Sequence, residues 1–417
     1  MTDLQPGQFL TVEIEKLVYG GDGLARHESC AVFVPRGVPG DRVVVRLTEV
    51  KATYARGEIT EILSPSPSRL HPECQAFHDG CGGCQWLHIA YADQLAWKKR
   101  IVEETLARVG KLPDVPVHDV IGMTDPFFYR NKLVVRARGP AEKLRVGLHT
   151  PKTHWVVNVF NRADGQCYIQ SPLNNRLARA LAAFLVRRRL PLKVATIQTS
   201  EEGEVGIDLD RKLTAEITAE LHGIGRQSPH VHYTVNGRRF RVTPPSFFQA
   251  NTAQTGALID AALGLLPEGR FRTVVDVYCG VGLFSLFLAG RADVVYGIEE
   301  SRTAVEDARH NAEAQGASNV RFIRGKAEEG LPAIVADAGR VDAVLVDPPR
   351  AGCDPVVLDA ISRCQPSVLV YVSCDPTTLA RDLAVLRQQG LIPTEVQPVD
   401  MFPQTYHIEC VAACVRV

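Results

Sequence analysis

The sequence predicts a multidomain α/β protein with three parts: a small N-terminal β-barrel over residues 1–62, an α+β central domain over residues 63–245 and a C-terminal Rossmann-like domain over residues 246–417. The chain has 417 residues, more than one hydrophobic core usually serves. Short alternating or apolar runs between turn signals fill the first 62 residues, as in a small barrel. From about residue 272, apolar runs alternate with helical segments, the pattern of a doubly wound parallel sheet.

In the N-terminal part, residues 9–14 and 42–47 alternate apolar and polar side chains, and residues 31–35 form a short apolar run. Gly20 to Gly23 is a turn signal between expected strands. The part ends at Ser64-Pro-Ser-Pro-Ser68, which has the composition of a linker. We therefore expect about five short strands followed by a domain boundary.

In the central part, apolar side chains at helical spacing predict a helix over residues 91–110, which could pack on the C-terminal domain. Further along, residues 133–137 and 155–160 have the pattern of strands, and residues 177–187 that of a helix. Periodicity alone indicates no chemistry for this part.

The charges are unevenly distributed, although 47 Lys and Arg balance 47 Asp and Glu and the net charge is zero. Residues 127–162 hold eight basic side chains and one acid, Glu142, while residues 187–189 and 238–241 add two smaller basic groups. A solvated face usually explains one such run, but three with aromatic rings interleaved favour a surface that contacts phosphates and stacks bases. The basic residues of the first run are Arg130, Lys132, Arg136, Arg138, Lys143, Arg145, Lys152 and Arg162, and its rings include Tyr129, His149, His154 and Trp155.

Four cysteines predict a metal site. No stretch reaches 18 uninterrupted apolar residues and the chain starts without an export signal, so we expect no membrane span, a cytoplasmic location and no disulfides. Cys74, Cys81 and Cys84 are separated by six and two residues, and Cys167 stands alone further along. This spacing suits Zn(Cys)4 or an iron–sulfur cluster and does not choose between them. The other cysteines are scattered, and most are expected to be buried small hydrophobic residues: Cys30, Cys279, Cys353, Cys364, Cys374, Cys410 and Cys414.

The start of the C-terminal part predicts a nucleotide-cofactor site. Its first strand ends in Asp276-Val-Tyr-Cys-Gly280-Val-Gly282, and the second ends in Glu299, 23 residues after Asp276. Glycines let the backbone turn tightly against a ligand, and an acid at the second strand can accept the hydroxyls of a ribose. Ser285 replaces the third glycine of the dinucleotide fingerprint, which favours S-adenosylmethionine over NAD. A packing turn with an exposed Glu299 is the alternative.

Three later strands bring reactive side chains to the same edge. The fourth ends in Asp347-Pro-Pro-Arg350, where the prolines hold the carboxylate rigidly; amino-group methyltransferases continue a similar loop with an aromatic residue instead of Arg350. Cys374 follows the fifth strand, and although such a cysteine usually belongs to the core, a helix start at Pro376 would lower the pKa of its thiol. Glu409 stands in an apolar strand, where burial would raise its pKa toward the range of a general base.

Five segments, in family order and spanning the chain, resemble the S-adenosylmethionine-dependent RNA uracil-5 methyltransferases. They are Ser246-Phe-Phe-Gln249-Ala-Asn251, Asp276-Val-Tyr-Cys-Gly-Val-Gly282, Asp347-Pro-Pro-Arg350-Ala-Gly352, Ser373-Cys374-Asp375-Pro376 and Phe402-Pro-Gln-Thr-Tyr-His-Ile-Glu409. The resemblance implies a class I methyltransferase domain in which Cys374 is the nucleophile and Glu409 the base. It implies cofactor contacts at Gln249, Tyr278, Glu299 and Asp347. Lys326 departs from the family, because relatives often have an acid there.

The ribosomal-RNA branch of this family carries a [4Fe-4S] cluster at positions that match Cys74, Cys81, Cys84 and Cys167, and an RNA-binding TRAM barrel that residues 1–62 resemble. The resemblance therefore implies a structural cluster and RNA as partner, with 23S ribosomal RNA favoured and tRNA as the alternative. No obligate protein partner is evident. Two other classes remain open: a metal-dependent RNA-binding protein without activity would not need Cys374 or Glu409, and an amino-group methyltransferase would form no thiol adduct.

Overall fold

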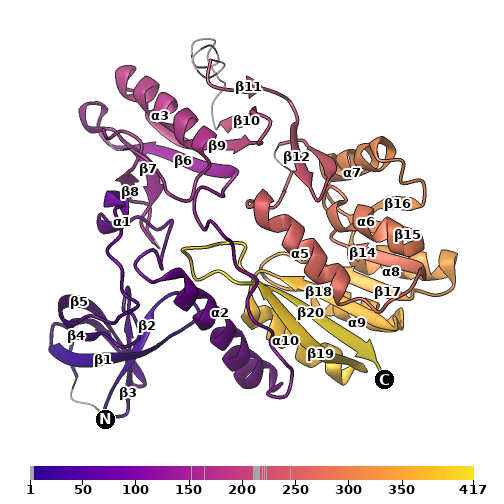
Figure 1. The fold of residues 1–417 in the computed structure, drawn as a ribbon, viewed down its shortest axis with the longest axis horizontal. Helices are drawn as coiled ribbons and strands as arrows, with labels where there is room; N and C mark the ends of the chain where they lie inside the picture. Colours follow the sequence, from indigo (N-terminus) through magenta and orange to yellow (C-terminus); the bar gives the residue numbers. More distant parts are fainter. Residues whose placement is uncertain are drawn as a thin grey trace.

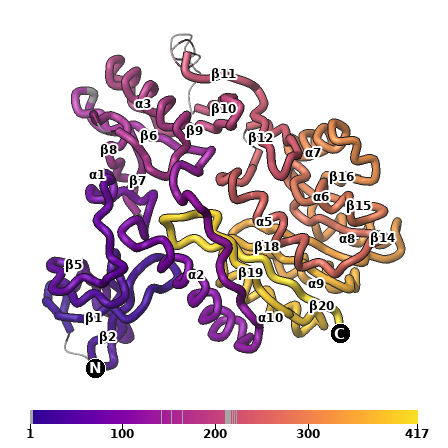
Figure 2. Tube along the Cα trace, in the orientation of Figure 1, coloured from indigo at the N-terminus to yellow at the C-terminus, as the bar shows by residue number. Residues whose placement is uncertain are grey.

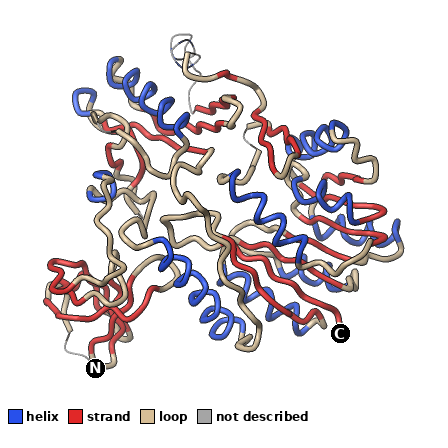
Figure 3. Tube along the Cα trace, viewed as in Figure 1, coloured by secondary structure: helices blue, strands red, loops and turns tan. Residues whose placement is uncertain are grey.

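The computed structural model describes residues 4–151, 153–163, 165–209, 223–244 and 246–417, together with residues 217, 219 and 221. Figure 1 shows a barrel, a central sheet with its helices, and a large sheet covered by helices on both faces. Figure 2 follows the chain through them in that order, and Figure 3 shows that strands dominate the barrel while helices and strands alternate in the last part. Lys152, in the predicted basic run, lies outside the described residues.

The N-terminal strands form a closed barrel in the order β1-β2-β3-β5-β4, which confirms the predicted barrel. Alternation along β1 turns Leu10, Val12 and Ile14 into the barrel interior and leaves the residues between them exposed. Closure pairs every strand edge, so the small sheet needs no covering helix. The strands are β1 (Phe9–Leu17), β2 (Gly23–His27), β3 (Cys30–Val34), β4 (Arg42–Val50) and β5 (Tyr54–Ser64).

The central part is a six-stranded sheet, in the order β11-β10-β9-β6-β7-β8, with helix α3 packed on it (Figure 1). α3 begins at Pro172 rather than at the predicted residue 177, because the Ser171 side chain caps it by accepting from the Asn174 N–H. The elements are α1 (Gln75–His78), β6 (Lys132–Arg138), η2 (Ala141–Lys143), β7 (Arg145–His149), β8 (Val156–Asn158), α3 (Pro172–Arg187), β9 (Leu192–Thr199), β10 (Glu204–Leu209) and β11 (Arg226–Gln227).

A seven-stranded sheet in the order β16-β15-β14-β17-β18-β20-β19 forms the C-terminal part. The five predicted strands are parallel, but β20 runs antiparallel to both β18 and β19, which the sequence patterns did not predict. The strands are β14 (Phe271–Val277), β15 (Ala292–Glu299), β16 (Val320–Arg324), β17 (Ala343–Val346), β18 (Val368–Ser373), β19 (Leu391–Val399) and β20 (Glu409–Arg416). The helices are α5 (Thr252–Gly264), α6 (Leu283–Leu288), η3 (Ala289–Arg291), α7 (Arg302–Ala314), α8 (Ala327–Ala338), α9 (Pro355–Arg363) and α10 (Pro376–Gln388).

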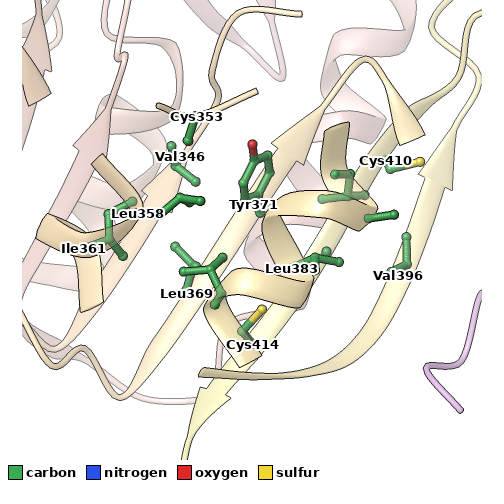
Figure 4. Close-up of a cluster of buried hydrophobic side chains, with 14 of the residues drawn as sticks. Val346, Cys353, Leu358, Ile361, Leu369, Tyr371, Leu383, Val396, Cys410 and Cys414 are labelled. Carbon is green, nitrogen blue, oxygen red and sulfur yellow. The ribbon is translucent and has the colours of Figure 1, made fainter. Parts of the chain in front are cut away.

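Each face of this sheet has its own hydrophobic core. Neighbouring residues of one strand divide between the two cores, as Leu369 and Val370 of β18 do, because successive side chains point to opposite faces. Figure 4 shows the core beneath α9 and α10, where Leu358 and Leu383 meet Tyr371. Six of the seven scattered cysteines are buried as predicted, whereas Cys374 is only partly buried.

Two segments from earlier in the chain complete these cores. Helix α2 (Tyr91–Thr105), continued by a π-helical turn, η1 (Leu106–Gly110), contributes Ile101 and Leu106 to the core beside α10. The ribbon of β12 (Val231–Val235) and β13 (Arg238–Val242) packs into the opposite core. We therefore propose a division in which the catalytic unit starts at this ribbon rather than at residue 246. Within the described residues, no helix is both long and apolar enough to cross a bilayer.

Candidate active site

The predicted catalytic and cofactor residues gather at the carboxyl ends of the sheet. Tyr278 follows β14, Glu299 ends β15, Asp347 follows β17 and Cys374 follows β18. Because the carboxyl ends of parallel strands meet at one edge, these four side chains surround one crevice, the usual ligand site of such sheets.

Strand register brings the predicted nucleophile and base together. Ser373 of β18 pairs with Cys410 of β20, so the next pair along the antiparallel ladder sets Cys374 opposite Glu409. Glu409 is 3% exposed, and burial, with the Asp347 carboxylate nearby, raises its pKa well above its ordinary value. The site therefore contains a thiol and a desolvated carboxyl group as direct neighbours.

The thiol of Cys374 is strongly protonated in this environment. Burial raises its pKa to about 12, and the carboxylates of Glu409 and Asp347 add to the shift, while Arg350 opposes it. The expectation that the start of α10 lowers this pKa is wrong, because desolvation and the nearby carboxylates outweigh the helix. Formation of a thiolate therefore depends on Arg350 and on changes that accompany substrate binding.

Glu299 is held in place by two backbone groups. Its Oε2 accepts from the Gly280 N–H at 3.1 Å and its Oε1 from the Ser301 N–H at 2.8 Å. A carboxylate has about four acceptor positions, so two remain for a pair of hydroxyls. This geometry suits the predicted contact with a ribose.

The loop after β14 has a strained backbone. Tyr278 has φ +64°, in the left-handed region that residues other than glycine rarely adopt. Gly282 has φ +84°, and a Cβ there would lie 3.0 Å from Cζ of Phe322. Because such strain concentrates at functional sites, the predicted cofactor loop has the expected physical character.

Asp276 is a buried acid that the sequence patterns did not place in the site. Its Oδ2 accepts from the Ser285 hydroxyl at 2.5 Å, whereas its Oδ1 has no hydrogen-bond partner within the described part of the chain. Burial raises the pKa of both Asp276 and Asp347 to about 7. An acid within the apolar run Val274-Val-Asp-Val277 was the available signal.

Gln249 lies at the junction between the central part and the sheet. It is 5% exposed, and its backbone carbonyl accepts from Nδ2 of Asn131 at 2.9 Å. Two residues on, Asn251 caps α5 and its Nδ2 donates to the Met401 carbonyl at 3.0 Å. This segment therefore connects the central part to the loop that precedes Glu409.

The four cysteines of the predicted metal site line one small cavity, which also includes Phe77 and Leu148. Burial raises the pKa of the Cys81 thiol to about 12 and also raises those of Cys84 and Cys167. No group of three or more His, Cys, Asp or Glu side chains in the described ranges is arranged to hold a metal ion. The donor set thus shares a cavity, without the compact arrangement around one point that a single ion requires.

Part of the predicted basic run forms an exposed surface on the central sheet. An open cavity of about 490 Å³ is lined mainly by Arg136, Arg138, His149, His154 and Lys193. Beside this region the Arg145 guanidinium stacks 3.6 Å from the ring centre of Trp155, which is 58% exposed. A stacked pair of this kind beside several cations suits bases and phosphates.

A larger cavity lies elsewhere. It measures about 690 Å³ and is lined by parts of residues 122–131, 171–176 and 199–203 and by the start of α5. None of the predicted catalytic or cofactor residues lines it, so cavity size alone would not have located the crevice around Cys374.

Comparisons with known proteins support these assignments. The sequence profile described as tRNA (Uracil-5-)-methyltransferase matches residues 226–416, and that of the TRAM domain matches residues 3–60. An RNA methyltransferase of Caldanaerobacter subterraneus is 36% identical over 461 residues, covering 100% of both chains. Another, of Thermosynechococcus vestitus, is 36% identical and covers 99% of both.

The structure of the Pyrococcus abyssi tRNA (uracil-54, C5)-methyltransferase, in complex with S-adenosyl-L-homocysteine, matches with a TM-score of 0.73 and 24% identity. The match covers 97% of this chain and 100% of that one, and it confirms the fold: a TRAM barrel followed by a Rossmann-like S-adenosylmethionine methyltransferase fold. With full-length relatives above 30% identity, this chain belongs to the tRNA (uracil-5-)-methyltransferase family and carries an N-terminal TRAM domain.

Proposed function

We propose that this protein transfers a methyl group from S-adenosylmethionine to C5 of a specific uridine in RNA. The observation that carries the proposal is the pairing of Cys374 with Glu409 at the carboxyl edge of the sheet. The neighbouring crevice supplies Tyr278, Glu299 and Asp347 as cofactor contacts. A non-catalytic RNA-binding protein would have no need for this arrangement.

The chemistry requires both groups, because uracil C5 is a weak nucleophile. The Cys374 thiolate adds to C6, which forms a C–S bond and moves electron density onto C5. S-adenosylmethionine supplies an electrophilic methyl group, which C5 attacks. The Glu409 carboxylate then removes the C5 proton, the C5–C6 double bond forms again, and the bond to Cys374 breaks to restore the thiolate. The target base must leave its stack to reach both residues.

The favoured substrate is 23S ribosomal RNA, because the chain resembles the ribosomal-RNA branch of the family in its four cysteines and its barrel. Transfer RNA is the second candidate, since both the family description and the Pyrococcus abyssi enzyme name tRNA. The test is to incubate the protein and S-adenosylmethionine separately with unmodified 23S ribosomal RNA and with tRNA, digest to nucleosides, and measure 5-methyluridine by mass spectrometry. The product in only one RNA would identify the substrate class, and its absence from both would overturn the proposal.

The mechanism has a separate test. RNA that contains 5-fluorouracil should trap the protein covalently, because fluorine at C5 cannot be removed as a proton. Cys374→Ser should form no adduct, whereas Cys30→Ser, a buried cysteine of the barrel, should form as much as the unchanged protein. An amino-group methyltransferase or a non-catalytic RNA-binding protein would form no adduct at all.

We further propose that Cys74, Cys81, Cys84 and Cys167 hold a [4Fe-4S] cluster with a structural role. Four thiols around one cavity fit a polynuclear cluster, which spreads its ligands over four irons, better than a single zinc ion. The charges of Arg36 and Arg130 act on these thiols and would offset the negative charge of a cluster. Anaerobically purified protein should contain about four irons and four sulfides per chain. A colourless protein with one zinc would overturn this assignment.

A further inference from the structure

The turn between β1 and β2 of the barrel reaches the crevice around Cys374. The indole N–H of Trp86 donates to the Gly21 carbonyl at 3.1 Å, and Leu17 belongs to the same hydrophobic core as α10. Gly21 has φ +95°, and a Cβ there would lie 3.0 Å from Cδ1 of Tyr406. The barrel is therefore docked on the catalytic part through close packing, with this turn at the contact.

Tyr19, in this turn, contacts the residues beside the nucleophile. Its hydroxyl accepts from Nη2 of Arg350 at 3.4 Å, and its ring meets that of Tyr406 edge to face at 5.6 Å. The Asp375 carboxylate is within hydrogen-bonding reach of the same hydroxyl and helps to raise the pKa of Tyr19. Asp375 directly follows Cys374 and lies 3.6 Å from Nε of Arg350.

Arg350 is the cation that counters the acids around the thiol. The groups that act on Cys374 are Glu409 from β20, Asp347 and Arg350 from the loop after β17, and Asp375 from its own segment. Three of these four are carboxylates. The Arg350 side chain is 53% exposed, so it keeps its place beside the thiol only if hydrogen bonds restrict its rotamers. The hydroxyls of Tyr19 and Tyr406 provide such bonds.

We infer that Tyr19 of the barrel is a positioning residue for the nucleophile: its hydroxyl holds the Arg350 guanidinium beside Cys374, so that the docked barrel completes the active site in addition to binding RNA. The inference rests on the proposed role of Cys374. It assigns to the barrel a part in thiol activation, which is distinct from a part in RNA affinity.

The experiment measures the rate at which iodoacetamide alkylates the Cys374 peptide of the full-length protein, by mass spectrometry, between pH 7 and 9.5. At pH values below the pKa of the thiol this rate follows the thiolate fraction. Tyr19→Phe should alkylate about 2- to 5-fold more slowly, because loss of a well-placed cation raises the thiol pKa. Tyr54→Phe, which changes another tyrosine of the barrel, is the matched control and should keep the original rate.

A double-mutant cycle with Arg350→Gln tests whether Tyr19 acts through Arg350. The double variant should be no slower than Arg350→Gln alone, because the two changes remove one effect. Additive losses would overturn the inference. A faster reaction in Tyr19→Phe would also overturn it, since loosened docking would expose the thiol. The alkylation rates do not depend on methyl transfer, so absence of 5-methyluridine from every RNA would defeat the proposed function without deciding the role of Tyr19.

Discussion

The ammonium group of Lys98 donates a hydrogen bond to the carboxylate of Asp400 at 2.6 Å, and both side chains are completely buried. Asp400 also accepts from the Tyr91 hydroxyl at 2.9 Å. Helix α2 is thereby attached to the loop that precedes β20 and Glu409, which extends from the sheet toward α2 in Figures 1 and 2. The position of the base thus depends on a buried ion pair with a distant helix.

Lys98→Met should destabilise the protein by about 3–5 kcal/mol, because it leaves the Asp400 carboxylate buried without its counter-charge. The free energy of unfolding in urea at neutral pH measures this. Lys99→Met is the matched control: the next residue pairs with Asp119 at 2.7 Å, but Asp119 is 95% exposed, so no measurable change is expected. Equal losses in the two variants would contradict the importance of burial.

The strand ends could be predicted from the sequence, but the contacts between them could not. Apolar runs and their boundaries placed Glu299 and Cys374 at strand ends, because burial of a parallel strand leaves a local pattern. The opposition of Cys374 and Glu409 depends on β20 running antiparallel to β18, and strand pairing of this kind leaves no pattern within either segment.

Burial of charged groups was also invisible in the sequence. Lys98 stands in a charged helical segment, and only its contact with a residue 302 positions away shows that it is internal. Tyr19 stands beside a glycine-rich turn, and its role depends on how the barrel docks. The same holds for Cys374, whose pKa follows from carboxylates on other strands rather than from the adjacent helix start.

Glu299→Gln should weaken the binding of S-adenosyl-L-homocysteine about 10-fold or more, because hydrogen bonds to a charged group contribute about 1.5–3 kcal/mol. The amide also cannot accept at both positions where Gly280 and Ser301 donate. Isothermal titration calorimetry measures the affinity. Glu300→Gln, at the exposed next residue, serves as control, and a comparable loss there would argue against a ribose contact by Glu299.

Asp276→Asn should change how stability depends on pH. Burial raises the pKa of Asp276 to about 7 from 3.8, so its stabilising contribution is complete below about pH 4 and is lost as pH rises through 7. The neutral amide lacks this loss. Relative to the unchanged protein, the variant should therefore gain about 2 kcal/mol of stability between pH 5 and pH 8.

Urea unfolding at the two pH values measures this gain. Asp293→Asn is the control, because Asp293 is 57% exposed and paired with Arg270, and it should show no comparable pH-dependent gain. If the stability difference between Asp276→Asn and the unchanged protein were the same at both pH values, Asp276 would already be ionised at pH 5.

Arg138→Ala should weaken RNA binding more at low salt than at high salt. Arg138 is exposed beside Arg136 and Lys193, in the basic cavity of the central sheet, where a phosphate contact would release counterions. Fluorescence anisotropy over a salt series should show a slope of log affinity against log salt reduced by about one. Arg363→Ala on α9, in an exposed pair with Asp359, should leave the slope unchanged. Equal losses by Arg138→Ala at all salt concentrations would contradict a phosphate contact.

Glu409→Gln should stop the reaction after methyl transfer, because an amide cannot accept the C5 proton. Yield of released 5-methyluridine should fall about 100-fold or more, the usual range for a general base. At the same time the protein should accumulate as a covalent complex with unmodified RNA and S-adenosylmethionine, visible on denaturing gels, whereas a second change, Cys374→Ser, should abolish that complex. In the unchanged protein, the raised pKa of Glu409 leaves most of the base protonated at low pH, so release of product should accelerate as pH rises. Normal turnover by Glu409→Gln, or a loss of product without a trapped complex, would show that another group removes the proton.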